Sequence, residues 1–206
     1  MCDMAKPALV LLVICFVVGA AMALTNALTE DRIAQRIKET AENSRRAVLP
    51  GADGFQKLDI EKIKALGGGE ADTIEEAYAA KKNGRAEGYV FLAGPKGYGG
   101  EISMTVGINA RGEVAGLEIG DNKETPGLGS KAADREFRDQ YLDRRFGVIR
   151  TVKGKAQKDD EVQAVSGATI TSAAVSRGVE QASMLAHALL SNNAGVSEDE
   201  LVENTR

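Results

Sequence analysis

A seven-residue stretch near the C-terminus, SGATITS at positions 166–172, combines one glycine with four hydroxyl side chains. The apolar residues that follow recur at three- and four-residue spacings, as on one face of a helix: Val175, Val179, Ala182, Leu185, Ala186 and Leu189. The first N–H groups of a helix lack intrahelical partners and lie at the positive end of its dipole, so this turn can hold a phosphate. Thr169 is well placed to contact it. The same spacing also fits a Ser/Thr helix cap without a ligand.

A second motif with unusual backbone properties is ETPGLG at positions 124–129. Pro126 fixes one backbone torsion, while Gly127 and Gly129 permit positive φ values. Such a loop can bring its peptide groups close to a flat partner with few side chains in the way. A helix is predicted from Ser130, with apolar residues at four-residue steps: Ala133, Phe137 and Tyr141. By composition alone, the motif also fits a Pro-Gly turn that leads into this helix.

Together the two motifs, in this order and a few dozen residues apart, resemble the FMN-binding domain of the RnfG and NqrC subunits of membrane redox complexes. The resemblance extends to the GYGG loop at positions 97–100, to the hairpin that follows it and to an apolar N-terminal segment. RnfG is the more similar, because NqrC subunits usually have more sequence between the membrane segment and the flavin motifs. The resemblance implies an α+β fold, with a single N-terminal transmembrane helix followed by one compact FMN-binding domain. This domain has a twisted, mainly antiparallel sheet and flanking helices.

The resemblance also implies which residues hold the flavin. Thr169 carries FMN covalently, through a phosphoester bond. The other residues of the turn shape it or donate to phosphate oxygens: Ser166, Gly167, Ala168, Thr171 and Ser172. The isoalloxazine ring is bordered by residues of two loops: Glu124, Thr125, Gly127 and Leu128, together with Tyr98 and Gly99. The chain departs from many relatives at Asn122, where they have a histidine two places before the glutamate of ETPGLG.

The N-terminal segment has no charged side chain between positions 7 and 29. As a helix, its 23 residues would span roughly 34 Å, enough to cross a hydrocarbon core of about 30 Å. A membrane anchor is therefore predicted at residues 1–28. The main alternative is a cleaved signal peptide, because Ala21-Met22-Ala23 matches a small-x-small cleavage pattern. The weakly charged start, with Lys6 against Asp3, favours the uncleaved anchor.

The charges that flank the segment bear on its orientation. Lys6 is the only basic residue before it, whereas Arg32, Arg36 and Lys38 follow it, and by simple counting this would keep the domain cytoplasmic. Long translocated domains follow the charge rule poorly. The resemblance implies a single-pass protein of the inner or plasma membrane with its domain on the extracytoplasmic side, and we adopt this prediction.

The composition excludes several classes of function. A net charge of −4 and a pI near 5.3 argue against nucleic-acid binding, for which a basic stripe is the expected footprint. Both cysteines lie in the first fifteen residues, and His187 is the only histidine. A protein-ligated iron–sulfur cluster, haem or zinc site is therefore not expected, and the isolated His187 is interpreted as a surface or packing residue. Any redox chemistry needs a bound organic cofactor.

The organisation of the chain follows from turns and periodicity. After the anchor, Thr29 is predicted to cap a helical stalk over residues 29–50, followed by the FMN-binding domain at 51–194 and a tail at 195–206. Strands are predicted at 88–93, 102–108 and 114–119, the last two joined by a hairpin turn at 109–112. Gly67-Gly68-Gly69 marks a loop, and residues 75–82 fit a helix or a strand. The glycine-rich stretch 94–100 also fits a flexible connection, and Arg144-Arg145 a solvated surface or a partner contact.

The function that the resemblance implies is electron transfer within a membrane complex. An RnfG-like subunit carries electrons on covalent FMN between ferredoxin and NAD, coupled to Na⁺ or H⁺ translocation. It acts as a carrier subunit of a translocase, without catalytic residues or metal ligands of its own. Its partners would be other membrane and peripheral subunits, a flavin transferase and membrane lipid, with no nucleic acid. An NqrC-like subunit of an NADH:quinone reductase and a cofactor-free extracytoplasmic adaptor remain the alternatives.

Overall fold

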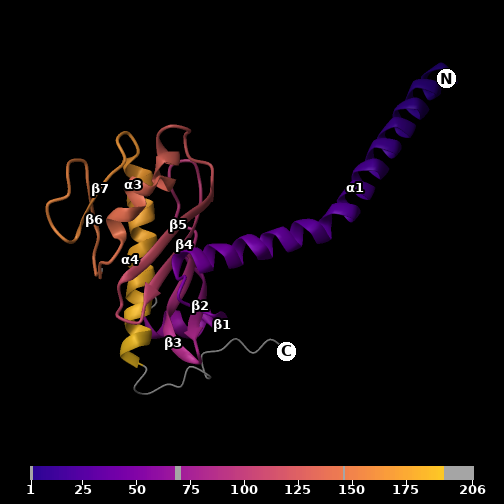
Figure 1. Ribbon diagram of the computed structural model, residues 1–206. Coiled ribbons are helices and arrows are strands. Elements are labelled where there is room, and N and C mark those ends of the chain that lie inside the picture. Colours follow the sequence, from indigo (N-terminus) through magenta and orange to yellow (C-terminus); the bar gives the residue numbers. More distant parts are fainter. Residues whose placement is uncertain (1, 68–70, 146, 193–206) are drawn as a thin grey trace. The chain divides into compact units, whose positions relative to one another are not determined.

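The computed structural model describes residues 2–67, 71–145 and 147–192 (Figure 1). Its chain divides into two compact units, one ending at Asn43 and the other beginning at Ser44. The predicted tail at 195–206 lies outside the described residues, and so do Gly68 and Gly69 of the predicted glycine loop.

The N-terminal helix α1, Cys2–Val48, runs without a break through the predicted anchor and the predicted stalk. The prediction that Thr29 caps a separate helix is wrong, because its hydroxyl donates to the backbone carbonyl of Thr25 at 2.8 Å, inside the helix. Residues 24–48 include no glycine or proline, so nothing in the sequence ends the helix at that point.

The apolar span of α1 and the C-terminal end of the helix both agree with the sequence pattern. Pro7–Glu30 is the one span among the described residues that is long and apolar enough to cross a membrane. The helix itself ends at Val48, before Pro50 and Gly51, two residues short of the predicted stalk end at residue 50.

The domain is built on a five-stranded antiparallel sheet in which each strand pairs with the next one along the chain. The strands are β1 (Gly54–Leu58), β2 (Ile74–Lys82), β3 (Arg85–Ala93), β4 (Ile102–Asn109) and β5 (Val114–Asn122). The three predicted strands are confirmed as β3, β4 and β5, each longer than predicted. Residues 75–82, left open between helix and strand, belong to β2.

Helix α4, Thr169–Asn192, covers one face of this sheet and packs against β2, β3 and β4 (Figure 1). Its predicted apolar stripe is buried, with no member more than 2% exposed. The short helix α2, Ile60–Leu66, packs beside α4. It begins after Asp59, whose side chain accepts from the N–H groups of Glu61 and Lys62.

The last turn of α1 covers the opposite face of the sheet, where Val48 is buried with Val90. Its backbone lies against Gly107 and Gly116, which pair with each other across β4 and β5. A Cβ on either glycine would come within 2.5 Å of a Val48 backbone atom, so the approach requires residues without a side chain. The end of α1, from Ser44 on, thus belongs to the folded domain.

The helix predicted from Ser130 is wrong as a single element. The segment forms three short helical turns: a 3₁₀ turn η1 (Gly129–Ala133), helix α3 (Arg135–Arg138) and a 3₁₀ turn η2 (Asp139–Tyr141). The break comes at Asp134, whose extended backbone (ψ 145°) starts a new turn, as short polar residues favour at helix ends. The apolar steps still mark buried positions: Phe137 and Tyr141 pack edge to face at 5.6 Å.

Two short parallel strands that the sequence did not reveal, β6 (Arg150–Val152) and β7 (Glu161–Gln163), lead the chain toward α4. Gln140 fixes β7 with its side-chain amide, which accepts from the N–H of Gln163 at 2.8 Å and donates to its carbonyl at 3.2 Å. Gln140 therefore holds β7 in place just before the turn that leads into α4.

Candidate cofactor-binding cleft

Three loops that are far apart in the sequence meet around one cleft of ≈ 520 Å³. Its lining comes from the glycine-rich loop, from the ETPGLG motif and from the turn before α4: Tyr98, Glu124, Thr125, Leu128, Gly129, Gly167, Ala168, Thr169, Ile170 and Thr171. We refer to residues 97–100, 124–129 and 166–171 as the three cleft segments. The structure thus brings together the two motifs that the sequence singled out.

The segment before α4 is a tight turn. The N–H of Ala168 donates to the carbonyl of Val165 at 2.9 Å, and Gly167, at the third position of this turn, has φ +78°. This positive φ fits a type II turn, which requires glycine or asparagine there. Helix α4 begins immediately afterwards at Thr169, whose half-buried side chain lies on the cleft wall.

The ETPGLG segment repeats the same construction. The N–H of Leu128 donates to the carbonyl of Thr125 at 3.1 Å, with Pro126 second and Gly127 third in the turn, and Gly127 has φ +77°. The two turns touch, because a Cβ added to Gly167 would lie 3.2 Å from Cδ2 of Leu128. Two type II turns therefore form adjacent walls of the cleft.

The hydroxyl groups of residues 166–172 have different surroundings. Thr171 is 1% exposed, and its hydroxyl donates to Oε2 of Glu124 at 2.6 Å. The hydroxyl of Ser172 donates to the carbonyl of Ala168 and accepts from the N–H of Val165, both at 2.9 Å. Ser172 is fully buried beneath the turn, so its oxygen serves the fold.

Other predicted site residues lie beside the cleft and do not line it. Ser166 is exposed and borders a separate cavity of ≈ 420 Å³, between the turn and α3. Gly99 contributes its N–H to the side chain of Glu124, and Gly127 shapes the turn. The sequence missed Ile170, which is 58% exposed at the cleft although it follows Thr169 directly. The sequence feature that could have indicated Ile170 is an apolar side chain in the first turn of α4 that lies outside the buried stripe.

Glu124 is buried where the three cleft segments meet, with 7% of its surface exposed. Its Oε1 accepts from the N–H of Gly99 at 2.9 Å, and its Oε2 accepts from Thr171. Its own N–H donates to Oδ1 of Asn122 at 3.3 Å, and Nδ2 of Asn122 donates to the carbonyl of Gly120 at 3.0 Å. Asn122 therefore shapes the end of β5 and the start of ETPGLG.

Metal ligands and the histidine are the other side chains that redox chemistry could use. Within the part of the chain that the structure describes, no group of three or more His, Cys, Asp or Glu side chains is placed to hold a metal ion. His187 is exposed on α4, with Nδ1 3.4 Å from the hydroxyl of Ser191.

Comparison with known proteins identifies the family. Residues 3–48 match the RnfG N-terminal region, and residues 97–183 match the FMN-binding domain. A protein of Acetobacterium woodii, named as the G subunit of a Na(+)-translocating ferredoxin:NAD(+) oxidoreductase complex, is 38% identical over 181 residues, which cover 84% of this chain and 87% of the relative. This chain belongs to the RnfG family.

Further relatives agree with this assignment. The corresponding protein of Clostridium ljungdahlii, whose complex is named proton-translocating, is 34% identical over 172 residues, covering 84% of this chain and 85% of the relative. The crystal structure of NqrC from Shewanella oneidensis matches with a TM-score of 0.54 and 15% identity, over 74% of this chain and 99% of that one. That likeness confirms the predicted fold. The predicted RnfG relationship and FMN-binding domain are confirmed, and the apolar helix fits a single-pass membrane subunit of a multi-subunit complex.

Proposed function

We propose that this RnfG-family protein is a membrane-anchored electron carrier whose FMN is bound covalently to Thr169. The observation that carries the proposal is the single cleft in which ETPGLG, the glycine-rich loop and the start of α4 come together. When bound, FMN supplies one- and two-electron transfer. The protein supplies its attachment, its orientation and its shielding from water.

The choice of Thr169 rests on the surroundings of the nearby hydroxyl groups. A phosphoester needs a hydroxyl oxygen that is free to bond to phosphorus. Thr171 and Ser172 are buried, and their hydroxyl groups are bonded to Glu124 and Ala168. Ser166 borders a different cavity. Thr169 is half-buried on the cleft wall at the N-terminus of α4, where unpaired N–H groups and the dipole favour the remaining negative charge of a phosphodiester.

The rest of the cleft suits a flat aromatic ring. Leu128 is 45% exposed, and Ile170 and Tyr98 are also exposed at the cleft, so each leaves apolar surface that a ring could cover. Thr125 adds a hydroxyl to the lining. We assign Leu128 and Tyr98 to contact the isoalloxazine and Gly167 and Ala168 to hold the phosphate end.

The setting of the carrier follows from its relatives. Their names describe ferredoxin:NAD(+) oxidoreductases that translocate Na⁺ in one case and protons in the other, so we propose the same electron route coupled to one of these ions. Helix α1 would anchor the domain in the membrane through Pro7–Glu30, with the domain on the extracytoplasmic side. Other subunits, membrane lipid and a flavin transferase would be its partners.

The test is to express the full chain with and without a flavin transferase and to examine flavin fluorescence in a denaturing gel. Fluorescence that depends on the transferase supports covalent FMN. A non-fluorescent protein in the presence of an active transferase would favour the cofactor-free adaptor. Protease added to spheroplasts tests the topology, because an extracytoplasmic domain is digested and a cytoplasmic one is protected until the membrane is opened.

A further inference from the structure

We propose that Glu124 is a positioning residue that locks the three cleft segments together from beneath, without being a ligand of the flavin. The proposal rests on the proposed function in so far as the cleft is taken to hold FMN. Its structural part, the locking of the three segments, concerns the protein alone.

The hydrogen bonds of the carboxyl group support this role. One oxygen accepts from the backbone of the glycine-rich loop at Gly99, and the other accepts from the side chain of Thr171 in the first turn of α4. These partners lie 25 and 47 residues away in the sequence. Glu124 itself opens the ETPGLG segment, so one side chain connects all three.

Glycines around the carboxyl group give a second, independent indication. A Cβ on Gly129 would lie 2.5 Å from Oε2 of Glu124 and 2.9 Å from Oγ1 of Thr171. A Cβ on Gly97 would collide with Oε1 of Glu124, and one on Gly99 with the carbonyl of Lys123. Glycines of two cleft segments thus leave the space that this side chain fills, as expected of a close-packed junction.

The carboxyl group and the proposed ring surface have different surroundings within the cleft. Both oxygens of Glu124 are already bonded, and the side chain is almost wholly buried. Leu128, by contrast, is exposed, and it rests against Gly167 of the neighbouring turn. Glu124 therefore sets the position of the wall that carries Leu128 relative to α4, and we expect the flavin to respond to Glu124 through that wall.

The experiment uses the full chain co-expressed with a flavin transferase, as wild type, Glu124→Ala, Glu124→Gln and Thr171→Val. We expect the flavin to remain covalently attached in all four, because Thr169 is retained. In Glu124→Ala and Thr171→Val the native flavin fluorescence should rise, its visible circular dichroism should fall and its midpoint potential should move toward that of free FMN. Glu124→Gln should restore much of the wild-type signal, since an amide oxygen still accepts from Gly99 and the Thr171 hydroxyl can accept from the new NH₂ group.

A double variant shows whether the two side chains act as one unit. If they do, Glu124→Ala combined with Thr171→Val should change the signals little more than either change alone. Glu113→Gln, at the other end of β5, is the matched control and should leave every flavin signal unchanged. Wild-type fluorescence, dichroism and potential in Glu124→Ala, or fully additive effects in the double variant, would overturn the proposal.

Hydrogen exchange tests the locking even if the wild type proves to carry no flavin, which would defeat the proposed function separately. Glu124→Ala should speed amide exchange at Gly99, in residues 124–129 and in the first turn of α4, while β1 to β3 exchange as in the wild type. Thr171→Val provides the same test if Glu124→Ala does not fold. Unchanged protection of these three segments would refute the locking role.

Discussion

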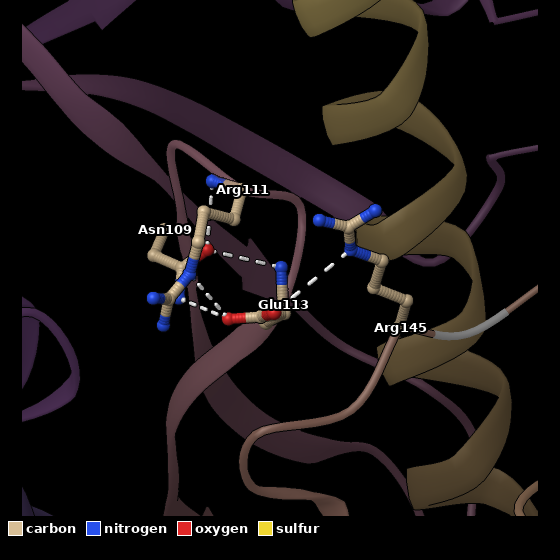
Figure 2. Close-up of polar contacts among 4 residues, drawn as sticks. All are labelled: Asn109, Arg111, Glu113 and Arg145. Atoms are coloured by element: carbon tan, nitrogen blue, oxygen red, sulfur yellow. Dashed lines mark hydrogen bonds and ion pairs between the residues drawn. The ribbon is translucent and has the colours of Figure 1, made fainter.

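Two carboxyl groups at opposite ends of β5 illustrate two ways of using the same side chain. Glu113 precedes the strand and accepts from Nδ2 of Asn109 at 3.1 Å and from Nε of Arg111 at 2.7 Å, with Nε of Arg145 at 4.0 Å (Figure 2). Glu124 follows the strand and bonds to Gly99 and Thr171.

The difference between them lies in burial and in sequence distance. Asn109 and Arg111 belong to the same hairpin as Glu113, and both arginine side chains are largely exposed. The network therefore stabilises a local turn, and water screens its charges. Glu124 is buried and joins segments from three parts of the chain, so its loss would leave the buried Thr171 hydroxyl without its partner. Glu113 therefore stabilises a hairpin, whereas Glu124 holds together the three segments of the cleft.

The largest effect is expected from Thr169→Val, which changes the cleft near the end of β5 that carries Glu124. This change keeps the branched shape and removes the oxygen, so it should abolish covalent flavin while leaving the melting temperature within about 2 °C of the wild type, as for a surface change. Thr171→Val should retain attachment. Flavin fluorescence in a denaturing gel measures both, with Glu113→Gln as the control from the hairpin end. Retention of flavin by Thr169→Val would mean that another hydroxyl carries it.

The next effect concerns stability and compares the two carboxyl groups directly. Glu124→Ala should lower the free energy of unfolding by about 2 kcal/mol, because the buried Thr171 hydroxyl loses its acceptor and so does the Gly99 N–H. Glu113→Ala should lower it much less, since its two arginine partners are largely exposed. Urea unfolding of the two variants gives the comparison, and equal losses would remove the distinction drawn between the ends of β5.

A smaller effect is expected from Leu128→Ala, which alters the cleft wall but leaves the hydrogen bonds of Glu124 to Gly99 and Thr171 in place. The flavin should stay attached, and its spectrum and midpoint potential should shift because part of the ring becomes exposed to water. Stability should change by less than about 1 kcal/mol, as Leu128 is already 45% exposed. A spectrum and potential identical to those of the wild type would remove Leu128 from the flavin contacts.

The smallest effect is a pH dependence at the hairpin end. The pKa of Glu113 lies below its ordinary value of 4.5, chiefly because Asn109 donates a hydrogen bond to it and further because Arg111 does so. A lowered folded-state pKa gives stability that is present above the ordinary pKa and is lost as the pH falls through the folded value. The difference in melting temperature between wild type and Glu113→Gln should therefore be present at neutral pH and decrease as the pH falls below 4.5, through the lowered pKa of Glu113. A difference that persists in acid would point to packing as its cause.

The features that sequence predicted best are those with a regular period or a local turn. The stripe from Val175 to Leu189 marks the buried face of α4, and the hairpin at 109–112 joins two strands, because burial and turn chemistry leave their pattern in neighbouring residues. The separate helix start at Thr29 was wrong because an N-cap residue starts a new helix only where the preceding helix has ended, and residues 24–28 include no glycine or proline that would end it. The prediction of one helix from Ser130 was wrong because the extended backbone of Asp134 interrupts the helix.

The cleft could be predicted only in part for a related reason. The resemblance named most of its lining, but the partners of Glu124 lie far along the chain, and no period or spacing connects them. The burial of Thr171 and Ser172 likewise depends on what packs over the first turn of α4. Their hydroxyl oxygens bond to Glu124 and Ala168, and a sequence of four hydroxyl residues does not distinguish such roles from that of Thr169.

The attachment of FMN to Thr169 is tested most directly by mapping the flavin on the wild-type protein. Trypsin releases residues 159–177 as one peptide, because Lys158 and Arg177 bound a stretch without other basic residues. This peptide contains Ser166, Thr169, Thr171 and Ser172, so fragmentation in a mass spectrometer can assign the modified residue. We expect one FMN phosphoester, on Thr169, when the flavin transferase is present. An FMN on Thr171 or Ser166, or a peptide that stays unmodified beside an active transferase, would contradict it.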